Sequence, residues 1–551
     1  MFYSHWGPSS EESSPKPHIM CGIAGVFNRD ARPADVSLAS RMIERLGHRG
    51  PDACGAVSLG PVALAHARLS IIDIAGGQQP MSLSDGRLSI TFNGEIFNYL
   101  ELREELTRQG CIFRTKSDTE VILHLYARDG TDCVRDLNGQ WAFAIWDSLS
   151  QTLFLSRDRM GVRPLFHTEV DGAFLFASEI KGLFADPRVE RSIDPQGLDQ
   201  CFTLWAPVAP RTAFKRIAEL PPGCSLQVSA DEQRQLRHWQ ADYPASVAAT
   251  EDESAEQLLS LLVEATRLRL RADVPVAAYL SGGIDSTAIA AIATRFTATR
   301  LRTFSVSFDD AEFDESVYQR EASEWLGTEH ENIRCSPSDI GRVFPEVVWH
   351  AERPLFRTAA APMFLLSQLV RDSGYKVALT GEGADEILGG YDIFKETKIR
   401  RFCSAMPQSR LRPLLLRRLY PYLPNVQSQS DQYLQAFFAA SSAGGDDPFF
   451  SHMPRWTSSA RLRLFYSSDL RATLESHSSP TDDMRALLPD AHAQWDSFAR
   501  AQFLETAHLL PGYILSAQGD RVAMAHGSRG DTRFSTRASS RLRHRCRRNS
   551  K

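Results

Sequence analysis

The second half of the sequence alternates short apolar runs with helical stretches, and this alternation constrains the fold more than any other feature. The apolar runs lie at 276–280, 302–308 and 377–380, and each ends at a polar or glycine-rich turn. Stretches with helical character, such as 287–297 and 316–326, lie between them. Buried strands separated by helices pair in parallel, so the pattern predicts an α/β domain with a parallel sheet. Ligands of such sheets bind beyond the carboxyl ends of the strands, where the turns lie.

The motif SGGIDS directly follows the first of these runs and directly precedes a helix. Gly282 and Gly283 let the backbone wrap closely round an anion, and the helix N-terminus adds oriented N–H groups. Ser281 and Ser286 add hydroxyl donors, while Asp285 stands where a Walker loop would carry lysine and suits a Mg²⁺ bridge to phosphate. A lone Gly-Gly pair is more often an ordinary turn. The position of this Gly-Gly pair between a strand and a helix favours a phosphate-binding loop.

A second glycine-rich turn, TGEGADEILGGY, begins at Thr380 at the end of another apolar run. It places three acids, Glu382, Asp385 and Glu386, among four glycines. Acids beside a phosphate-binding loop usually hold metal or transfer protons, and the glycine density favours this interpretation over a solvated turn. The acidic segment FDDAEFDES, which begins at Phe308, is explained at least as well by a capped, exposed loop.

The first third of the chain differs, because short strands outnumber helices there. The predicted strands lie at 62–66, 141–147, 153–158 and 174–178. Leu38, Met42 and Leu46 share one helical face, and Ser117 with Glu120 predicts a capping box before a second helix. The pattern indicates a layered α+β domain.

The pair Met20-Cys21 opens the stretch CGIAGVF. If the mature chain begins at Cys21, its thiol lies beside a free α-amine, and that amine can act as the base that activates the sulfur. An internal cysteine has a non-basic amide in this place. The preceding residues are polar and rich in Ser and Pro, without the apolar core of a secretory signal. We therefore expect that translation starts at Met20 or that the segment is removed.

Three further segments of this first part carry candidate binding residues. Arg68, in HARLSIID, offers a guanidinium to a bound carboxylate. Asn93 and Gly94, in NGEIFN, offer an amide and a backbone N–H, the two donors of an oxyanion hole. Asp118 can bind an ammonium group, although helix capping would also explain it. Taken alone, each of these residues more often serves to stabilise a turn. Together with Cys21 they predict a hydrolase that acts on the amide of a zwitterionic amino acid.

Composition excludes several other classes of protein. The formal net charge is −5, so no global field favours nucleic acid or an anionic membrane, and no apolar run approaches a bilayer span. The nine cysteines are scattered without a CxxC pair, which disfavours a disulfide framework and a zinc ribbon. A reduced, cytoplasmic enzyme fits best.

The motifs together resemble a known family. CGIAGV, HRGPD, RLSIID, NGEIFN, SDTE and FASEIK are similar to the N-terminal-nucleophile glutaminase domain of amidotransferases, and SGGIDS with TGEGADE is similar to the ATP-pyrophosphatase domain. Their union in this order resembles the glutamine-hydrolysing asparagine synthetases, from Cys21 to about His526. The resemblance implies ATP and Mg²⁺ as cofactors, glutamine and aspartate as substrates, a place in asparagine biosynthesis, and a homodimer as one option for assembly.

The resemblance also implies a role for each matching residue. In the glutaminase domain, Cys21 would attack the glutamine amide, Asn93 and Gly94 would hold the oxyanion, and Arg68, Glu95 and Asp118 would bind the amino-acid end. The implied ATP-binding residues are Leu280, Ser281, Gly282, Gly283, Asp285, Ser286, Val306, Thr380 and Gly381. Asp285 and Asp385 would lie near Mg²⁺–pyrophosphate. Glu382 would take a proton from ammonia as it attacks.

The expected domain boundaries follow from these motifs. Residues 1–20 form an extension or a mis-assigned start, 21–235 the glutaminase domain, 236–250 a linker, 251–526 the synthetase domain with a helical C-terminal part, and 527–551 a basic tail. The tail departs from the family, which continues with a segment like VEGRxPFLDHRVVE. Synonymous codons for 527–540 can encode VEGRYPVFD in a shifted frame, so we expect a single-base slip near codon 527, which resequencing would test.

Four functions are compatible with this sequence. Asparagine synthesis leads, and amidation of another carboxylate by a sibling enzyme comes second. A truncated product with glutaminase activity alone is third. A non-catalytic binding protein is the least favoured, because such drift should erode Cys21, SGGIDS or Glu382, and all are present.

Overall fold

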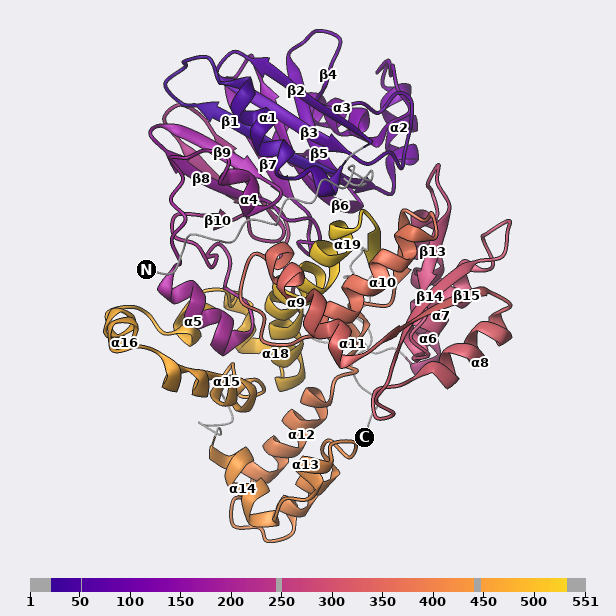
Figure 1. The fold of residues 1–551 in the computed structure, drawn as a ribbon, viewed down its shortest axis with the longest axis vertical. Helices are drawn as coiled ribbons and strands as arrows, with labels where there is room; N and C mark the ends of the chain where they lie inside the picture. Colours follow the sequence, from indigo (N-terminus) through magenta and orange to yellow (C-terminus); the bar gives the residue numbers. More distant parts are fainter. Residues whose placement is uncertain (1–20, 51, 244–249, 441–446, 533–551) are drawn as a thin grey trace.

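The structure, a computed structural model, describes residues 21–50, 52–243, 250–440 and 447–532. The predicted extension, residues 244–249 of the predicted linker and the tail beyond 532 lie outside the described residues. Figure 1 shows the first domain in indigo and magenta, and it packs on a second domain that contains a parallel sheet and many helices.

Two six-stranded antiparallel sheets form the first domain, in the orders β10-β8-β9-β1-β3-β2 and β12-β11-β7-β6-β5-β4. The strands are β1 Gly22–Asn28, β2 Ala53–Leu59, β3 Val62–Arg68, β4 Met81–Ser82, β5 Leu88–Ile96, β6 Gly139–Asp147, β7 Thr152–Arg157, β8 Phe166–Val170, β9 Ala173–Ala177, β10 Ala218–Glu219, β11 Cys224–Val228 and β12 Gln233–Arg237. The helices are α1 Val36–Glu44, η1 Gly47–Arg49, α2 Tyr99–Arg108, α3 Asp118–Asp129, η2 Gly130–Arg135, α4 Ile180–Leu183 and α5 Pro195–Leu204.

The two sheets pack face to face between layers of helix. In β1, Ile23 and Phe27 point into the core between the sheets, whereas Ala24 and Val26 pack with α1 on the outer face. α2 and α3 cover the outer face of the other sheet. The period-2 alternation of β1 therefore separates two apolar cores, and the predicted α+β layered domain is confirmed.

The predicted strands of this domain are present with small shifts at their ends, but two helix predictions were wrong in detail. α1 ends at Glu44, before Leu46. Ser117 caps α3 by accepting from the Thr119 N–H, yet Glu120 accepts from the N–H groups of Arg114 and Thr115. The capping box does not form, because the loop that precedes Ser117 engages the Glu120 carboxylate.

The second domain is built on a five-stranded parallel sheet with strand order β15-β14-β13-β16-β17. Its elements are α6 Glu251–Arg269, β13 Val276–Tyr279, α7 Ile284–Ala293, β14 Arg302–Phe308, α8 Ser316–Leu326, β15 Glu329–Cys335, α9 Pro337–Ala351, α10 Ala360–Asp372, β16 Val377–Thr380 and α11 Ala384–Leu388. The predicted parallel sheet is confirmed. The helix expected at 287–297 begins earlier, at Ile284, since Gly283 occupies the N-cap position.

A helical part follows and returns to the sheet at its end. Its elements are α12 Asp392–Ser404, η3 Arg412–Arg418, α13 Pro424–Gln427, α14 Asp431–Ala440, α15 Met453–Ser459, η4 Ala460–Phe465, α16 Ser468–Glu475, α17 Pro480–Arg485, η5 Asp490–Gln494, α18 Ser497–Leu504, the π-helix η6 Glu505–Asp520, α19 Arg521–Ala525 and β17 Arg529–Thr532. β17 pairs in parallel with β16. Figure 1 shows α19, in yellow, beneath the first domain at the centre of the molecule.

Two observations concern the remaining sequence predictions. The start of the predicted linker is packed: β12 runs to Arg237, and Tyr243 is buried against the helical part. In the portion of the chain that the structure describes, none of the helices has the length and apolarity needed to cross a membrane.

Candidate active sites

Cys21 lies directly before β1, at a cavity of about 500 Å³ that includes its open mouth. Its Sγ accepts from the Leu69 N–H at 3.3 Å and donates to the Leu69 carbonyl at 3.6 Å. Burial raises the pKa of the Cys21 thiol, and the Leu69 N–H and the Arg68 charge oppose this shift without reversing it. The resting thiol is therefore protonated near neutral pH and needs a base before it can attack.

The structure brings every predicted residue of the glutaminase site to this one cavity. These residues are Cys21, Arg68, Asn93, Gly94, Glu95 and Asp118. Arg68 ends β3, and its guanidinium donates to the carbonyls of Asp73 and Ile74 at 2.6 and 2.9 Å. A cation held in place in this way can bind a substrate carboxylate with little loss of side-chain entropy.

Asn93 and Gly94 lie side by side on β5 and form the candidate oxyanion hole. The Nδ2 of Asn93 is buried and has no hydrogen-bond partner within the described part of the chain. An unpaired buried donor is costly, so this atom suits a charge that develops on a bound substrate. A Cβ on Gly94 would lie 2.1 Å from the carbonyl oxygen of Gln140. No larger side chain fits here without moving the β5 backbone.

Replacement of Gly94 by alanine should therefore damage both stability and glutamine hydrolysis. We expect a loss of about 1–3 kcal/mol in the free energy of unfolding, because overpacking displaces β5. Glutamate release should fall about 100-fold, as for the loss of one oxyanion donor. Thermal unfolding and a glutamate assay measure the two effects. Gly47→Ala is the control, since no atom lies within 4 Å of a Cβ built there, and equal effects in the two variants would contradict this account.

Two buried acids, Glu95 and Asp118, face the same cavity. Burial raises the pKa of Glu95 to about 8, although the nearby Arg529 charge opposes the shift. Burial also raises the pKa of Asp118 to about 6, opposed by the Ile96 N–H, which donates to Oδ2 at 3.0 Å. A bound cation stabilises buried carboxylates of this kind, and the ammonium group of an amino acid would be such a cation.

Sequence reasoning missed three polar residues of this cavity, Gln79, Arg163 and Arg529. Gln79 pairs with the backbone of Phe92, accepting from its N–H at 2.6 Å and donating to its carbonyl at 3.2 Å. No periodicity marks these residues. Arg529 belongs to the second domain, in a segment expected to lie outside the fold, and β17 brings it here.

The second cavity is much larger, about 2540 Å³ including open solvent, and lies at the carboxyl ends of the parallel strands. Of the predicted ATP-site residues it is lined by Leu280, Ser281, Asp285, Ser286, Val306, Thr380 and Gly381. Asp385 and Glu382 also line it. Gly282 and Gly283 shape the loop instead of lining the cavity.

Hydrogen bonds within the SGGIDS loop hold it open for an anion. The hydroxyls of Ser281 and Ser286 bond each other at 2.9 Å, and the Gly283 N–H donates to Ser281 Oγ at 3.2 Å. Gly282 adopts a φ of +85°, and a Cβ there would lie 2.8 Å from the Cβ of Tyr318. Glycine is therefore required at 282 for conformation and for space. α7 begins at Ile284, directly after the two glycines, so the helix N-terminus lies at the loop as a phosphate site requires.

The two predicted metal-site acids lie close enough to affect each other. Burial raises the pKa of Asp385, and the charge of Asp285 raises it further. Burial also raises the pKa of Asp285. Two carboxylates that repel each other beside a phosphate-binding loop fit a divalent cation, which would relieve the repulsion.

Glu382 lies where the second cavity meets a third cavity of about 390 Å³. Burial raises the pKa of Glu382 to about 8, with a further contribution from the Glu386 charge. The third cavity is also lined by Arg163, which lines the Cys21 cavity as well, and by Gly519 and Gly530. The three cavities thus follow one another from Cys21 to Glu382.

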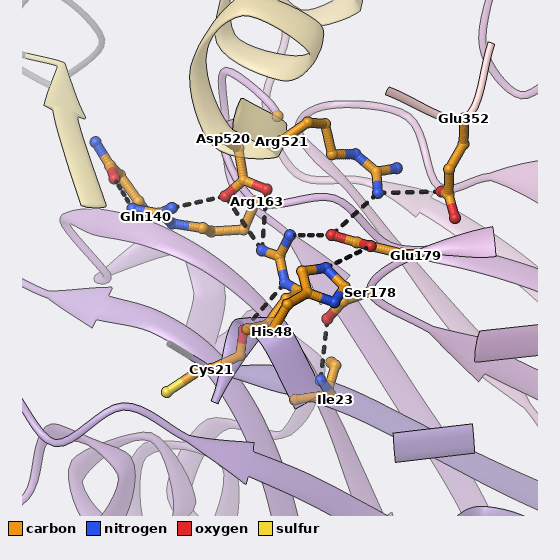
Figure 2. A network of polar contacts seen from close by, with 12 residues as sticks. Cys21, Ile23, His48, Gln140, Arg163, Ser178, Glu179, Glu352, Asp520 and Arg521 are labelled. Atoms are coloured by element: carbon orange, nitrogen blue, oxygen red, sulfur yellow. Dashed lines mark hydrogen bonds and ion pairs between the residues drawn. The ribbon is translucent and has the colours of Figure 1, made fainter. Parts of the chain in front are cut away.

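Between the domains lies a largely buried ion-pair network, which we call the interdomain network. Its members are His48, Arg49, Arg163, Glu179, Lys181, Glu352, Asp520 and Arg521. Figure 2 shows the contacts around Glu179 and Asp520. Arg49 donates to Glu179 at 2.6 Å, to Asp520 at 2.9 Å and to the carbonyl of Cys21 at 3.3 Å. Arg163 donates to the other oxygen of Asp520 at 2.8 Å. Two motifs far apart in sequence, HRGPD and FASEIK, therefore meet Asp520 and Arg521 behind the Cys21 main chain.

Glu179 is the central anion of the interdomain network. Burial raises its pKa, but the charges of Lys181, His48, Arg521 and Arg49 hold the pKa of Glu179 well below its ordinary value. Glu179 therefore stays ionised. Loss of one partner of a buried pair typically costs about 3–5 kcal/mol, so a substitution that removes one member of the network should destabilise the contact between the two domains.

Comparison with known families identifies both halves of the molecule. Residues 20–239 match the model of the glutamine amidotransferase domain, and residues 257–530 match that of asparagine synthase. The chain is thus a glutamine amidotransferase joined to an ATP-dependent synthetase domain.

Curated relatives narrow the class to one family. An asparagine synthetase (glutamine-hydrolysing) of Bacillus subtilis is 36% identical over 381 residues, 68% of this chain and 60% of the relative. A putative asparagine synthetase of Mycobacterium tuberculosis is 33% identical over 528 residues, 92% of this chain and 77% of the relative. An amidase, chyE, of Penicillium rubens is 29% identical over 554 residues, 92% of this chain and 79% of the relative. The chain belongs to the family of glutamine-hydrolysing asparagine synthetases.

Proposed function

We propose that this protein makes asparagine from aspartate, with ATP as the energy source and glutamine as the nitrogen donor. One observation carries the proposal: the cavity of Cys21 and the cavity of the SGGIDS loop lie on either side of a third cavity that Arg163 and Glu382 both line. Ammonia released at the first site would pass to the second along this line of cavities. The proposal includes a cytoplasmic location and a homodimer.

The first half-reaction takes place at Cys21. The α-amine of Cys21 takes the thiol proton, and Sγ attacks the amide carbon of glutamine. Asn93 Nδ2 and the Gly94 N–H stabilise the oxyanion of the tetrahedral intermediate. The carbon–nitrogen bond breaks, ammonia leaves with the proton from the amine, and water hydrolyses the thioester to glutamate. Arg68 binds the α-carboxylate, while Glu95 and Asp118 bind the ammonium group.

The second half-reaction takes place at the SGGIDS loop. An oxygen of the aspartate β-carboxylate attacks the α-phosphorus of ATP, and the bond to pyrophosphate breaks. Mg²⁺, when bound by Asp285 and Asp385, would neutralise charge on the pyrophosphate. Ammonia then attacks the activated carbonyl carbon, Glu382 takes one of its protons, and the carbon–oxygen bond to AMP breaks. Adenylation is needed because a free carboxylate is a poor electrophile.

A second candidate function is amidation of a different carboxylate. The 29% identity to a relative named as an amidase, over 92% of this chain, favours it. A product with glutaminase activity alone is disfavoured, since the asparagine synthase match spans 257–530. The acceptor therefore has to be measured.

One assay tests the proposal. The whole chain and a chain that begins at Cys21 each receive glutamine, aspartate and ATP with Mg²⁺, and glutamate, pyrophosphate and asparagine are quantified. We expect all three products from the shorter chain. The whole chain should release no glutamate, because its Cys21 amine is an amide. Glutamate without pyrophosphate would mean a glutaminase alone, and pyrophosphate that requires another acceptor would mean the second candidate.

A further inference from the structure

Strand β17 of the synthetase sheet places one of its side chains in the glutaminase cavity. Arg529 begins β17, which pairs with β16, yet its guanidinium lines the cavity of Cys21 together with Glu95 and Asp118. The next residue, Gly530, lines the third cavity instead. The strand is therefore a wall between the two cavities, and the alternation of side chains along it directs Arg529 to the glutamine side.

Arg529 forms a buried ion pair with Glu95 across the domain interface. Its Nη2 donates to Glu95 Oε2 and, at 2.6 Å, to Asp531 Oδ2. The side chains of Arg529 and Glu95 are 4% and 3% exposed, so water screens the pair very little. The other carboxylate oxygen, Oε1, has no hydrogen-bond partner among the described residues. Glu95 thus has one oxygen fixed by Arg529 and one oxygen left for a ligand.

We infer that Arg529 is a positioning residue of the glutamine site: from the synthetase sheet it holds and orients Glu95 by an ion pair across the domain interface, with Oε1 available to the ammonium group of glutamine. The inference rests on the proposed function, because glutamine is the ligand. Without Arg529, Glu95 would be a buried acid beside Asp118 and Asp531, and its pKa would rise further. A neutral carboxyl group binds ammonium far more weakly than a carboxylate does.

The arrangement makes the glutamine site incomplete without the second domain. β17 pairs Asp531 with Leu379 and Thr532 with Thr380, and Thr380 lines the ATP cavity. β17 therefore lines the glutamine site and pairs with the strand whose end lines the ATP cavity. A shift of β17 relative to the first domain would weaken the hold on Glu95 and hence the affinity for glutamine.

The test measures glutamine binding by calorimetry to the whole chain in a Cys21→Ala background, where no turnover occurs. Arg529→Met should raise the Kd for glutamine about tenfold or more, the equivalent of about 1.4 kcal/mol. R529K should recover most of the affinity, because it keeps the charge. Loss of Arg529 raises the pKa of Glu95 further above about 8, so the Kd of R529M should fall more steeply than that of the parent between pH 7 and 8.5.

A double-mutant cycle separates this role from general structural damage. Glu95→Gln should weaken binding, and R529M should add little in that background, because both changes remove the same ion pair. Arg302→Met is the matched control: Arg302 pairs with Glu331 on the same sheet, outside the three cavities described above, so its loss should leave the Kd unchanged. Thermal unfolding of each variant reports on folding, and R529K gives a second measurement if R529M is unstable.

Several outcomes would overturn the inference. Equal Kd values for R529M and the parent would do so while leaving the proposed function intact. An equally large effect of R529M in the E95Q background would show that Arg529 does not act through Glu95. If the parent fails to bind glutamine, the proposed function falls and the inference falls with it. Resequencing that returns a shifted frame at codon 527 would also overturn it, because Arg529 would be absent.

Discussion

Replacement of Cys21 by alanine should abolish the use of glutamine while leaving synthesis from free ammonia in place. The reason is geometric: Cys21, the proposed nucleophile, lines one cavity, whereas Asp285 and Glu382, the residues proposed to serve adenylation and amide formation, line another. Loss of a covalent nucleophile typically lowers the rate by about 10⁶. Glutamate release should fall to background, and asparagine formed from ammonium salts should stay within about twofold of the parent.

The same preparation supplies the controls for this experiment. Cys54→Ala removes an exposed thiol from β2 of the same domain and should change neither activity. Ammonia-dependent and glutamine-dependent synthesis are measured with asparagine as the common product. If Cys21→Ala lowered both to the same extent, the scheme with two separate sites would be wrong.

Glu382→Gln should have the opposite pattern, with glutamine hydrolysis preserved and asparagine formation lost. A general base typically contributes about 10²–10⁴ in rate, and the glutamine side chain has nearly the same size but cannot accept the proton. Aspartate-dependent exchange between ATP and pyrophosphate should persist, because adenylation precedes the attack of ammonia. The variant therefore separates activation of aspartate from amide formation.

The pH dependence adds a second measurement on Glu382. Burial raises its pKa to about 8, and the base has to be ionised, so the rate of amide formation should fall as pH drops through this value. In E382Q the residual rate should lack this acidic limb. Glu346→Gln, on α9 and away from the three cavities described above, is the control and should keep the parent profile. A limb that survives in E382Q would assign the ionisation to another group.

Much of the fold could be predicted, because the decisive signals are local. A strand needs four to eight apolar residues and a turn, and the runs ending at Leu280, Phe308 and Thr380 have both. The capping-box error concerns which of several neighbouring N–H groups a side chain binds. The Glu120 carboxylate takes the N–H groups of Arg114 and Thr115 instead of the Ser117 N–H, and a short motif does not reveal such competition.

The candidate sites also divide into parts that a local sequence pattern determines and parts that depend on residues far apart in the chain. Asn93 and Gly94 are neighbours on one strand, and SGGIDS is one loop, so a local pattern contains their geometry. Arg529 is 434 residues from Glu95 along the chain, and its position depends on the whole second domain and on the register of β17. The interdomain network is equally non-local, since Arg49 meets Asp520 across 471 residues. The HRGPD and FASEIK motifs marked two of these segments without showing that they touch.

The interdomain network also limits which substitutions the protein can accept at these positions. Asp520 pairs with Arg49 and Arg163 of the first half, and Arg521 pairs with Glu179 of the first half, so a mutation at one position removes an ion-pair partner from a buried charge in the other half of the protein. Recombination that joins the first half of one family member to the second half of another would inherit such mismatches unless these positions agree. The two halves should therefore be inherited together. Lineages in which one member of an ion pair is replaced should show a compensating substitution in the opposite half.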